Sequence, residues 1–130
     1  MVLQSVKEGI TGEACVAVDD SNTAIAAGSG SLPVFGTPFM IALMEKATCD
    51  AAASILEDGE TTVGTRIEVD HSRATGIGAV VTAQAVLTGI DRRKLTFRVS
   101  AHDDSGNTIG GGVIERFVVN GDKFMEKVGA

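Results

Sequence analysis

The chain has 130 residues, of which 44% are hydrophobic and 22% are charged, and its formal net charge at pH 7 is -6. This length accommodates one domain, residues 1–130, built around one hydrophobic core. The acidic balance disfavours nucleic acid and anionic membrane surfaces as partners, since binding either one requires a basic face.

The first half of the chain predicts a strand and a long helix. Residues 11–18 alternate between apolar and other residues, which indicates a strand. Residues 27–33 are rich in Gly and Ser and predict a mobile loop. Thr37 is expected to be the N-cap of a helix with Pro38 at position N1, where its missing N–H costs nothing. The helix is predicted over 38–56, and it ends before Gly59.

The apolar residues of this helix predict which side faces the core. They recur at helical spacing and comprise Met40, Met44, Ala47, Ala51 and Ile55. Lys46 and Asp50 are expected to pair at spacing i, i+4 on a wetter side.

The second half of the chain predicts a series of antiparallel strands. Residues 63–69, 79–90 and 95–101 alternate at period two, and 103–107 is a turn before a further strand that runs through 119. One early helix followed by two long hairpins is an α+β plan, in which the sheet curls around the helix. A single sheet leaves free edges, which favours dimerisation.

Neither a membrane segment nor a metal site is indicated. The longest apolar run, 39–44, is far too short to span a bilayer, and 1–8 has no signal-like apolar core. Cys15 and Cys49 lack C-x-x-C spacing, and we interpret both as reduced core residues. Because the chain has only two histidines, no cluster resembles a metal site. We therefore expect a cytoplasmic protein without a metal or other cofactor.

Glu45 is the first candidate for chemistry. Its helical neighbours Ile41, Cys49 and Ala52 form an apolar stripe. Burial there would raise the proton affinity of the carboxylate and favour its use as a base or nucleophile. A partly solvated carboxylate near Lys46 is the alternative interpretation.

His71 and Thr37 are the next candidates. His71 ends an inward-facing strand row, so its imidazole can meet the helix near Thr37 or Glu45 and transfer protons at neutral pH. Thr37 at a helix N-terminus can direct a hydroxyl and backbone N–H groups at a developing oxyanion. A structural histidine and a simple helix cap are the respective alternatives.

Two further segments have either a structural or a binding interpretation. Gly110, Gly111 and Gly112 lie within a strand and indicate a bulge or the close approach of a ligand or another backbone. The basic turn at 92–94 can hold the phosphates of a nucleotide carrier, or it is simply solvated.

The sequence resembles the hotdog-fold thioesterases, and within them the fluoroacetyl-CoA thioesterase-like group. The resemblance covers most of the chain from residue 34 onward. It is carried by VFGT at 34–37, FM and LME within 39–45, VGT and VDH within 63–71, RVSAHD at 98–103, ER at 115–116, and KF and KV within 123–128.

The resemblance implies a catalytic set of Thr37, Glu45 and His71 in a homodimer whose sites lie at the subunit interface. It also implies that Gly64 lies near the acyl group of an acyl-CoA substrate. Phe35, Gly111 and Arg116 complete our candidate substrate contacts.

The working mechanism gives each catalytic candidate one role. Glu45 attacks the thioester carbonyl or activates a water, Thr37 polarises the carbonyl, and His71 moves the proton.

The expected function is hydrolysis of an acyl-CoA, with a preference for short acyl chains. A non-catalytic acyl-CoA-binding or sensing module and an acyl-CoA hydratase are the alternatives. An acyl carrier protein can replace CoA as the carrier, and a tetramer can replace the dimer. The family's fluoroacetyl-specific enzyme has aromatic lid residues where this chain has 28–31 as Gly-Ser-Gly-Ser, so the resemblance does not extend to a role in fluoroacetate resistance.

Overall fold

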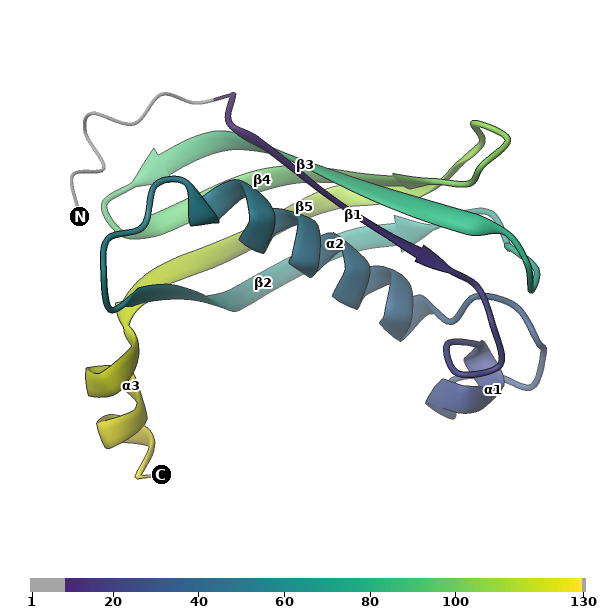
Figure 1. Ribbon diagram of the computed structural model, residues 1–130, viewed down its shortest axis with the longest axis horizontal. Helices are drawn as coiled ribbons and strands as arrows, with labels where there is room; N and C mark the ends of the chain where they lie inside the picture. Colours follow the sequence, from purple (N-terminus) through teal and green to yellow (C-terminus); the bar gives the residue numbers. More distant parts are fainter. Residues whose placement is uncertain (1–8, 130) are drawn as a thin grey trace.

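The computed structural model describes residues 9–129. The prediction that residues 1–8 have no signal-like apolar core concerns residues outside the described range. The elements in chain order are β1 (Thr11–Ala17), α1 (Ala24–Ala27), α2 (Thr37–Ala53), β2 (Glu60–His71), β3 (Val80–Asp91), β4 (Lys94–His102), β5 (Thr108–Asn120) and α3 (Gly121–Val128). The five strands form one antiparallel sheet in the order β1-β3-β4-β5-β2. The sheet curves around α2 as predicted (Figure 1).

The core lies between α2 and the concave face of the sheet. Met40, Met44 and Ala47 of the predicted stripe are fully buried, whereas Ile55 follows the helix end and is only partly buried. Small residues on the facing strands let the helix approach closely. At Gly12 of β1, an added Cβ would lie 2.2 Å from the carbonyl oxygen of Ala47. Each large side chain buried here stabilises the fold by about 1.5–3 kcal/mol.

The covering of the sheet by α2 is uneven. The helix packs mainly against β1 and β3 and only slightly against β2. Ile67 lies on β2 opposite the fully buried Ile114 of β5, yet 41% of its surface is exposed. The concave side of β2 therefore has little cover from its own chain.

The start of α2 differs from the prediction. Thr37 is the first helical residue, and Gly36 is the N-cap, without a side-chain hydrogen bond. The hydroxyl of Thr37 does not cap the helix because it is bonded elsewhere. Pro38 accordingly occupies the second position of the helix, where its missing N–H is still tolerated.

Two other local predictions are wrong, and one short helix was not predicted. Asp50 accepts a hydrogen bond from the Glu13 N–H at 3.0 Å, so it binds the edge of β1 instead of pairing with Lys46. Cys15 and Cys49 are exposed rather than buried in the core. The helix α3, which Asn120 caps through the Lys123 N–H, was not predicted, because eight residues give too short a periodic signal.

The segment before α2 is partly ordered by local structure. Thr23 caps the short α1 through the Ala26 N–H, and Gly28 ends it with a φ of +69°. Isolated bridges join Thr23 to Phe35 and Val34 to Gly76. The predicted loop 27–33 is otherwise irregular, and its mobility stays a prediction.

None of the described helices is both long and apolar enough to cross a membrane. Within residues 9–129, no group of three or more His, Cys, Asp or Glu side chains is arranged to hold a metal ion.

Candidate active site

The first part of the candidate site is a pair formed by Thr37 and His71. The Oγ1 atom of Thr37 and the Nδ1 atom of His71 share a hydrogen bond of 2.7 Å. Backbone bonds fix the approach to the helix, since the Phe35 N–H donates to the Thr75 carbonyl and the Gly36 N–H to that of Asn22. His71 thus contacts the helix at Thr37, the first of the two positions that the sequence allowed.

The environment of His71 favours its neutral form. Its Nε2 atom is buried and has no hydrogen-bond partner among the described residues. Burial lowers the pKa of His71 below its ordinary value of 6.5, although a backbone hydrogen bond at Arg73 acts in the opposite direction. An imidazolium would also bury an unmatched Nε2–H. At neutral pH the ring is therefore uncharged and able to accept or relay a proton.

The N-terminus of α2 adds hydrogen-bond donors beside this pair. The N–H groups of Phe39 and Met40 both donate to the Gly36 carbonyl at 3.0 Å. The Thr37 N–H has no intrahelical partner, because it belongs to the first turn. A hydroxyl and a free N–H on one residue, at the positive end of a helix dipole, suit the stabilisation of an oxyanion.

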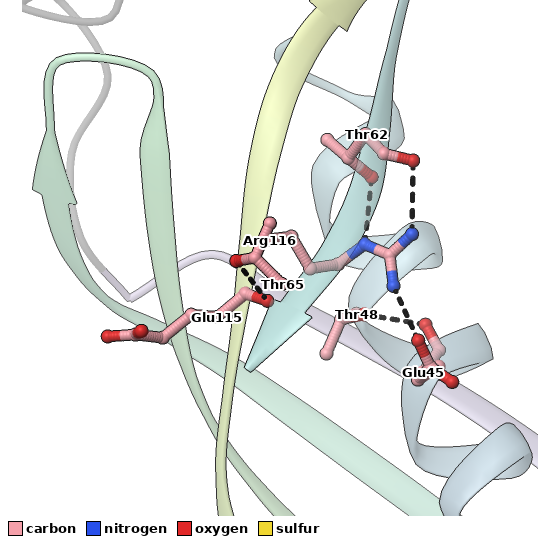
Figure 2. A network of polar contacts seen from close by, with 6 residues as sticks. All are labelled: Glu45, Thr48, Thr62, Thr65, Glu115 and Arg116. Carbon is pink, nitrogen blue, oxygen red and sulfur yellow. Dashed lines mark hydrogen bonds and ion pairs between the residues drawn. The ribbon is translucent and has the colours of Figure 1, made fainter. Parts of the chain in front are cut away.

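The second part of the candidate site is an ion pair between Glu45 and Arg116. An Nη1–Oε2 bond of 3.1 Å joins Arg116 to Glu45, while the same guanidinium donates to the hydroxyl and the carbonyl of Thr62 at 2.9 and 3.1 Å (Figure 2). Arg116 is 6% exposed and the Glu45 side chain 34% exposed. Of the two interpretations of Glu45, the structure favours the partly solvated carboxylate over apolar burial, with Arg116 and not Lys46 as its partner.

Gly64 explains how the carboxylate fits against β2. A Cβ atom at this position would lie 2.6 Å from Oε2 of Glu45. Gly64 therefore lies beside Glu45, and its closeness to the acyl group stays a prediction. Thr62 was not singled out from the sequence. Its position two residues before Gly64, on the same inward side of the strand, was the available signal.

Within one chain these two pairs are well separated. Glu45 follows Thr37 by eight helical residues, a rise of about 12 Å. Gly64 precedes His71 by seven strand residues, which span roughly 23 Å. One chain therefore does not bring the Glu45 carboxylate into contact with His71.

A cavity of about 250 Å³ opens beside the Thr37–His71 pair. We call it the Thr37 pocket, and its lining consists of Ala24, Ser29, Val34, Phe35, Thr37, His71, Ser72, Arg73 and Ala74. Phe35, a predicted substrate contact, thus lies beside Thr37 and is 1% exposed.

The structure does not bring Gly111 to either pair. It pairs with Asp70 and lines a depression with Arg66 and Glu68 on the other face of the sheet. Gly110 is the glycine that pairs with His71, and a Cβ there would lie 2.9 Å from the sulfur of Met40. The strand parity, and not the glycine run itself, decides which glycine faces the helix.

Comparison with known proteins relates this arrangement to one family. The family model described as fluoroacetyl-CoA-specific thioesterase matches residues 18–122. The chain is 47% identical over 95 residues to the fluoroacetyl-CoA thioesterase of Streptantibioticus cattleyicolor, covering 73% of this chain and 68% of that protein.

Solved structures agree with the fold. A variant of the fluoroacetyl-CoA thioesterase in complex with acetyl-CoA is 37% identical to this chain, with a TM-score of 0.88, and the match covers 95% of this chain and 96% of the other. A thioesterase superfamily member from Thermus thermophilus has a TM-score of 0.88 at 24% identity, covering 96% and 92%. This more distant similarity concerns the fold, and it confirms the predicted hotdog architecture.

Proposed function

The chain belongs to the fluoroacetyl-CoA-specific thioesterase family and is an acyl-CoA thioesterase, and we propose that Thr37, His71 and Glu45 carry out the hydrolysis. The observation that carries this assignment is the 2.7 Å bond between Thr37 and His71 at the N-terminus of α2. It joins a neutral proton carrier to an oxyanion-stabilising group in one pocket. The substrate that we propose is a short-chain acyl-CoA, converted to the free acid and CoA.

In the proposed reaction, the thioester carbonyl lies against the hydroxyl and the free N–H of Thr37. These donors stabilise the charge that develops on the carbonyl oxygen when the carbon is attacked. Glu45 supplies the attack in one of two ways. It deprotonates a water whose oxygen bonds to the carbonyl carbon, or its own carboxylate bonds to that carbon and a water then hydrolyses the resulting anhydride to the free acid. In both routes the carbon–sulfur bond breaks, and neutral His71 first accepts the proton that the water loses and then passes it by way of Thr37 to the departing thiolate.

Because Glu45 and His71 of one chain lie far apart, the proposed site needs two copies of the chain. β2 is an edge strand, and its twelve residues include no proline. An open edge of this length is a ready template for pairing with another strand. Ile67, on the little-covered concave side, gains cover when a second copy binds there. Both features support the homodimer through β2 that we propose.

Antiparallel pairing of two β2 strands also brings the two half-sites together. With the two-fold axis at Ile67, Arg66 lies opposite the partner's Glu68, so the charges match. The His71 end of one strand then lies beside the 62–64 stretch of the other. The Thr37–His71 pair of one subunit thereby meets the Glu45–Arg116 pair of its partner, while Gly64 leaves room beside the carboxylate.

The test is a thiol-release assay with acetyl-, propionyl- and butyryl-CoA, using the wild type and the His71→Asn and Glu45→Gln variants. We expect each variant to lose about 10²- to 10⁴-fold in kcat. His102→Asn is the matched control, because His102 belongs to β4 and takes no part in the site; it should retain wild-type activity.

Three outcomes would point elsewhere. Tight acyl-CoA binding without turnover would favour a binding or sensing module. Water addition to an enoyl-CoA without thiol release would favour a hydratase. Turnover of acyl carrier protein substrates alone would leave the mechanism but change the carrier.

A further inference from the structure

Phe35 belongs to the linings of two cavities. The first is the Thr37 pocket. The second, of about 220 Å³, lies between α2 and β1 and is lined by Cys15, Val16, Asn22, Phe35, Phe39, Ala42, Leu43 and Lys46. We call it the α2–β1 cavity. Phe35 is the one residue that belongs to both linings.

The α2–β1 cavity is suited to an apolar chain. Most of the residues that line it are aliphatic or aromatic. The side-chain amide of Asn22, which also lines it, is already hydrogen-bonded to the backbone. The Nδ2 of Asn22 donates to the Ala17 carbonyl, and its Oδ1 accepts from the Asp19 N–H, both at 2.9 Å. Since one water takes up about 30 Å³ of liquid, the cavity has room for roughly seven non-hydrogen atoms. A hydrocarbon tail of moderate length fits this volume.

Phe35 is held firmly between the two cavities. Its side chain is 1% exposed. Its backbone N–H donates to the Thr75 carbonyl at 2.8 Å, and a bridge joins it to Thr23. The next residue is anchored as well, through the bond from the Gly36 N–H to Asn22. The ring therefore has a fixed position, and rearranging it would disturb the approach to α2.

We propose that Phe35 is the specificity-determining wall that limits the acyl chain at the Thr37 pocket and separates it from the α2–β1 cavity. This inference rests on the proposed function, because it takes the acyl group to start at Thr37. In the wild type, a short acyl group ends against the ring. Removing the ring joins the two cavities, so that a longer tail enters an apolar space that it cannot reach otherwise.

The experiment measures kcat/KM for acetyl-, butyryl-, hexanoyl- and octanoyl-CoA with the wild type and Phe35→Ala. We expect the ratio of hexanoyl-CoA to acetyl-CoA to rise by about tenfold or more in the variant, since each methylene accommodated in an apolar pocket changes discrimination by that order. Phe35→Leu retains more of the packing and should shift the ratio in the same direction by a smaller factor.

Phe39→Ala is the matched control. It removes the same kind of ring from the α2–β1 cavity, but Phe39 does not line the Thr37 pocket. The chain-length ratio should stay at the wild-type value. An equal shift in Phe39→Ala, or an unchanged ratio in both Phe35 variants, would overturn the proposal.

A failure of the proposed function would be seen in a different measurement from a failure of the Phe35 proposal. If the wild type released no thiol from any substrate, calorimetric binding of acetyl- and hexanoyl-CoA to the same variants would still test the wall. The affinity ratio should then shift toward hexanoyl-CoA in Phe35→Ala but not in Phe39→Ala. An unshifted affinity ratio would reject the role of Phe35 whatever the activity.

Discussion

The two halves of the candidate site differ in how their groups are kept reactive. The Thr37–His71 pair is uncharged, and burial of one ring nitrogen keeps the imidazole neutral. The Glu45–Arg116 pair is ionic, and the arginine is held by three hydrogen bonds, two of them to Thr62 (Figure 2). A proton carrier needs to remain near its neutral state, whereas a charged attacking group needs a fixed position. The chain supplies these two requirements at separate places on one helix.

The largest expected effect tests whether the two halves belong to different subunits. We expect Glu45→Gln and His71→Asn to be nearly inactive alone, and a refolded equimolar mixture to recover about a quarter of the wild-type activity. Half of the dimers would be mixed, and each mixed dimer would contain one intact composite site.

Thiol release after mixing is the measurement, and mock-refolded single variants are the control. Native mass spectrometry establishes that the mixture contains mixed dimers. If such a mixture stayed inactive, each site would be built within one chain.

A medium effect is expected at Gly64, where β2 contacts the carboxylate of the Glu45–Arg116 pair. In Gly64→Ala, the new Cβ would lie 2.6 Å from Oε2 of Glu45 and displace the carboxylate. We expect kcat to fall by about tenfold to a hundredfold, since small displacements of catalytic groups cost rates of that order. The free energy of unfolding should change by less than about 1 kcal/mol, because the atom that must move is the far end of a flexible, partly exposed side chain.

Gly76→Ala is the control, because a Cβ at Gly76 would meet nothing within 4 Å. Steady-state kinetics and urea unfolding measure both quantities. Wild-type kinetics in Gly64→Ala would show that the carboxylate position is not needed.

The smallest expected effect is the pH dependence of stability and of kcat/KM that arises from His71 in the Thr37–His71 pair. The folded pKa of His71 lies below 6.5, so the unfolded chain binds more protons between the folded pKa and 6.5. The free energy of unfolding should therefore fall as the pH is lowered through this interval, and the fall should be shallower in His71→Asn. The acid limb of kcat/KM should have its midpoint below 6.5.

Urea unfolding at several pH values and a pH–rate profile provide the data, with His102→Asn as the reference. A midpoint above 6.5 would contradict a neutral His71 in the free enzyme.

Much of the fold could be predicted from the sequence because its signals are local. The apolar spacing of Met40, Met44 and Ala47 identified the buried side of α2, and all three are fully buried. Alternation at period two located the long strands, although β2 begins three residues earlier than predicted. The short α3 escaped prediction because its periodic signal covers only eight residues. The cysteines were assigned to the core by residue type, although Cys15 alternates with the more buried Ala14 and Val16.

Candidate residues were identified from local patterns and family resemblance, but their partners were not. The sequence placed Thr37 at a helix start and His71 at a strand end, which are statements about single elements. That the Thr37 hydroxyl bonds His71 and does not cap α2 depends on how β2 and the helix cross. Similarly, the apolar neighbours of Glu45 along the helix did not predict a guanidinium from 71 residues away.

The sequence by itself determined the one-helix, antiparallel-sheet plan of this thioesterase and the identity of Thr37, Glu45 and His71 as its candidate groups, because periodicity, helix-start chemistry and family motifs act over a few residues. Only the tertiary structure decided that these groups form two separate pairs, that Gly110 and not Gly111 faces the helix, and that Phe35 stands between two cavities. These features depend on strand register and on the packing of α2 across the sheet, which bring together residues far apart in the chain.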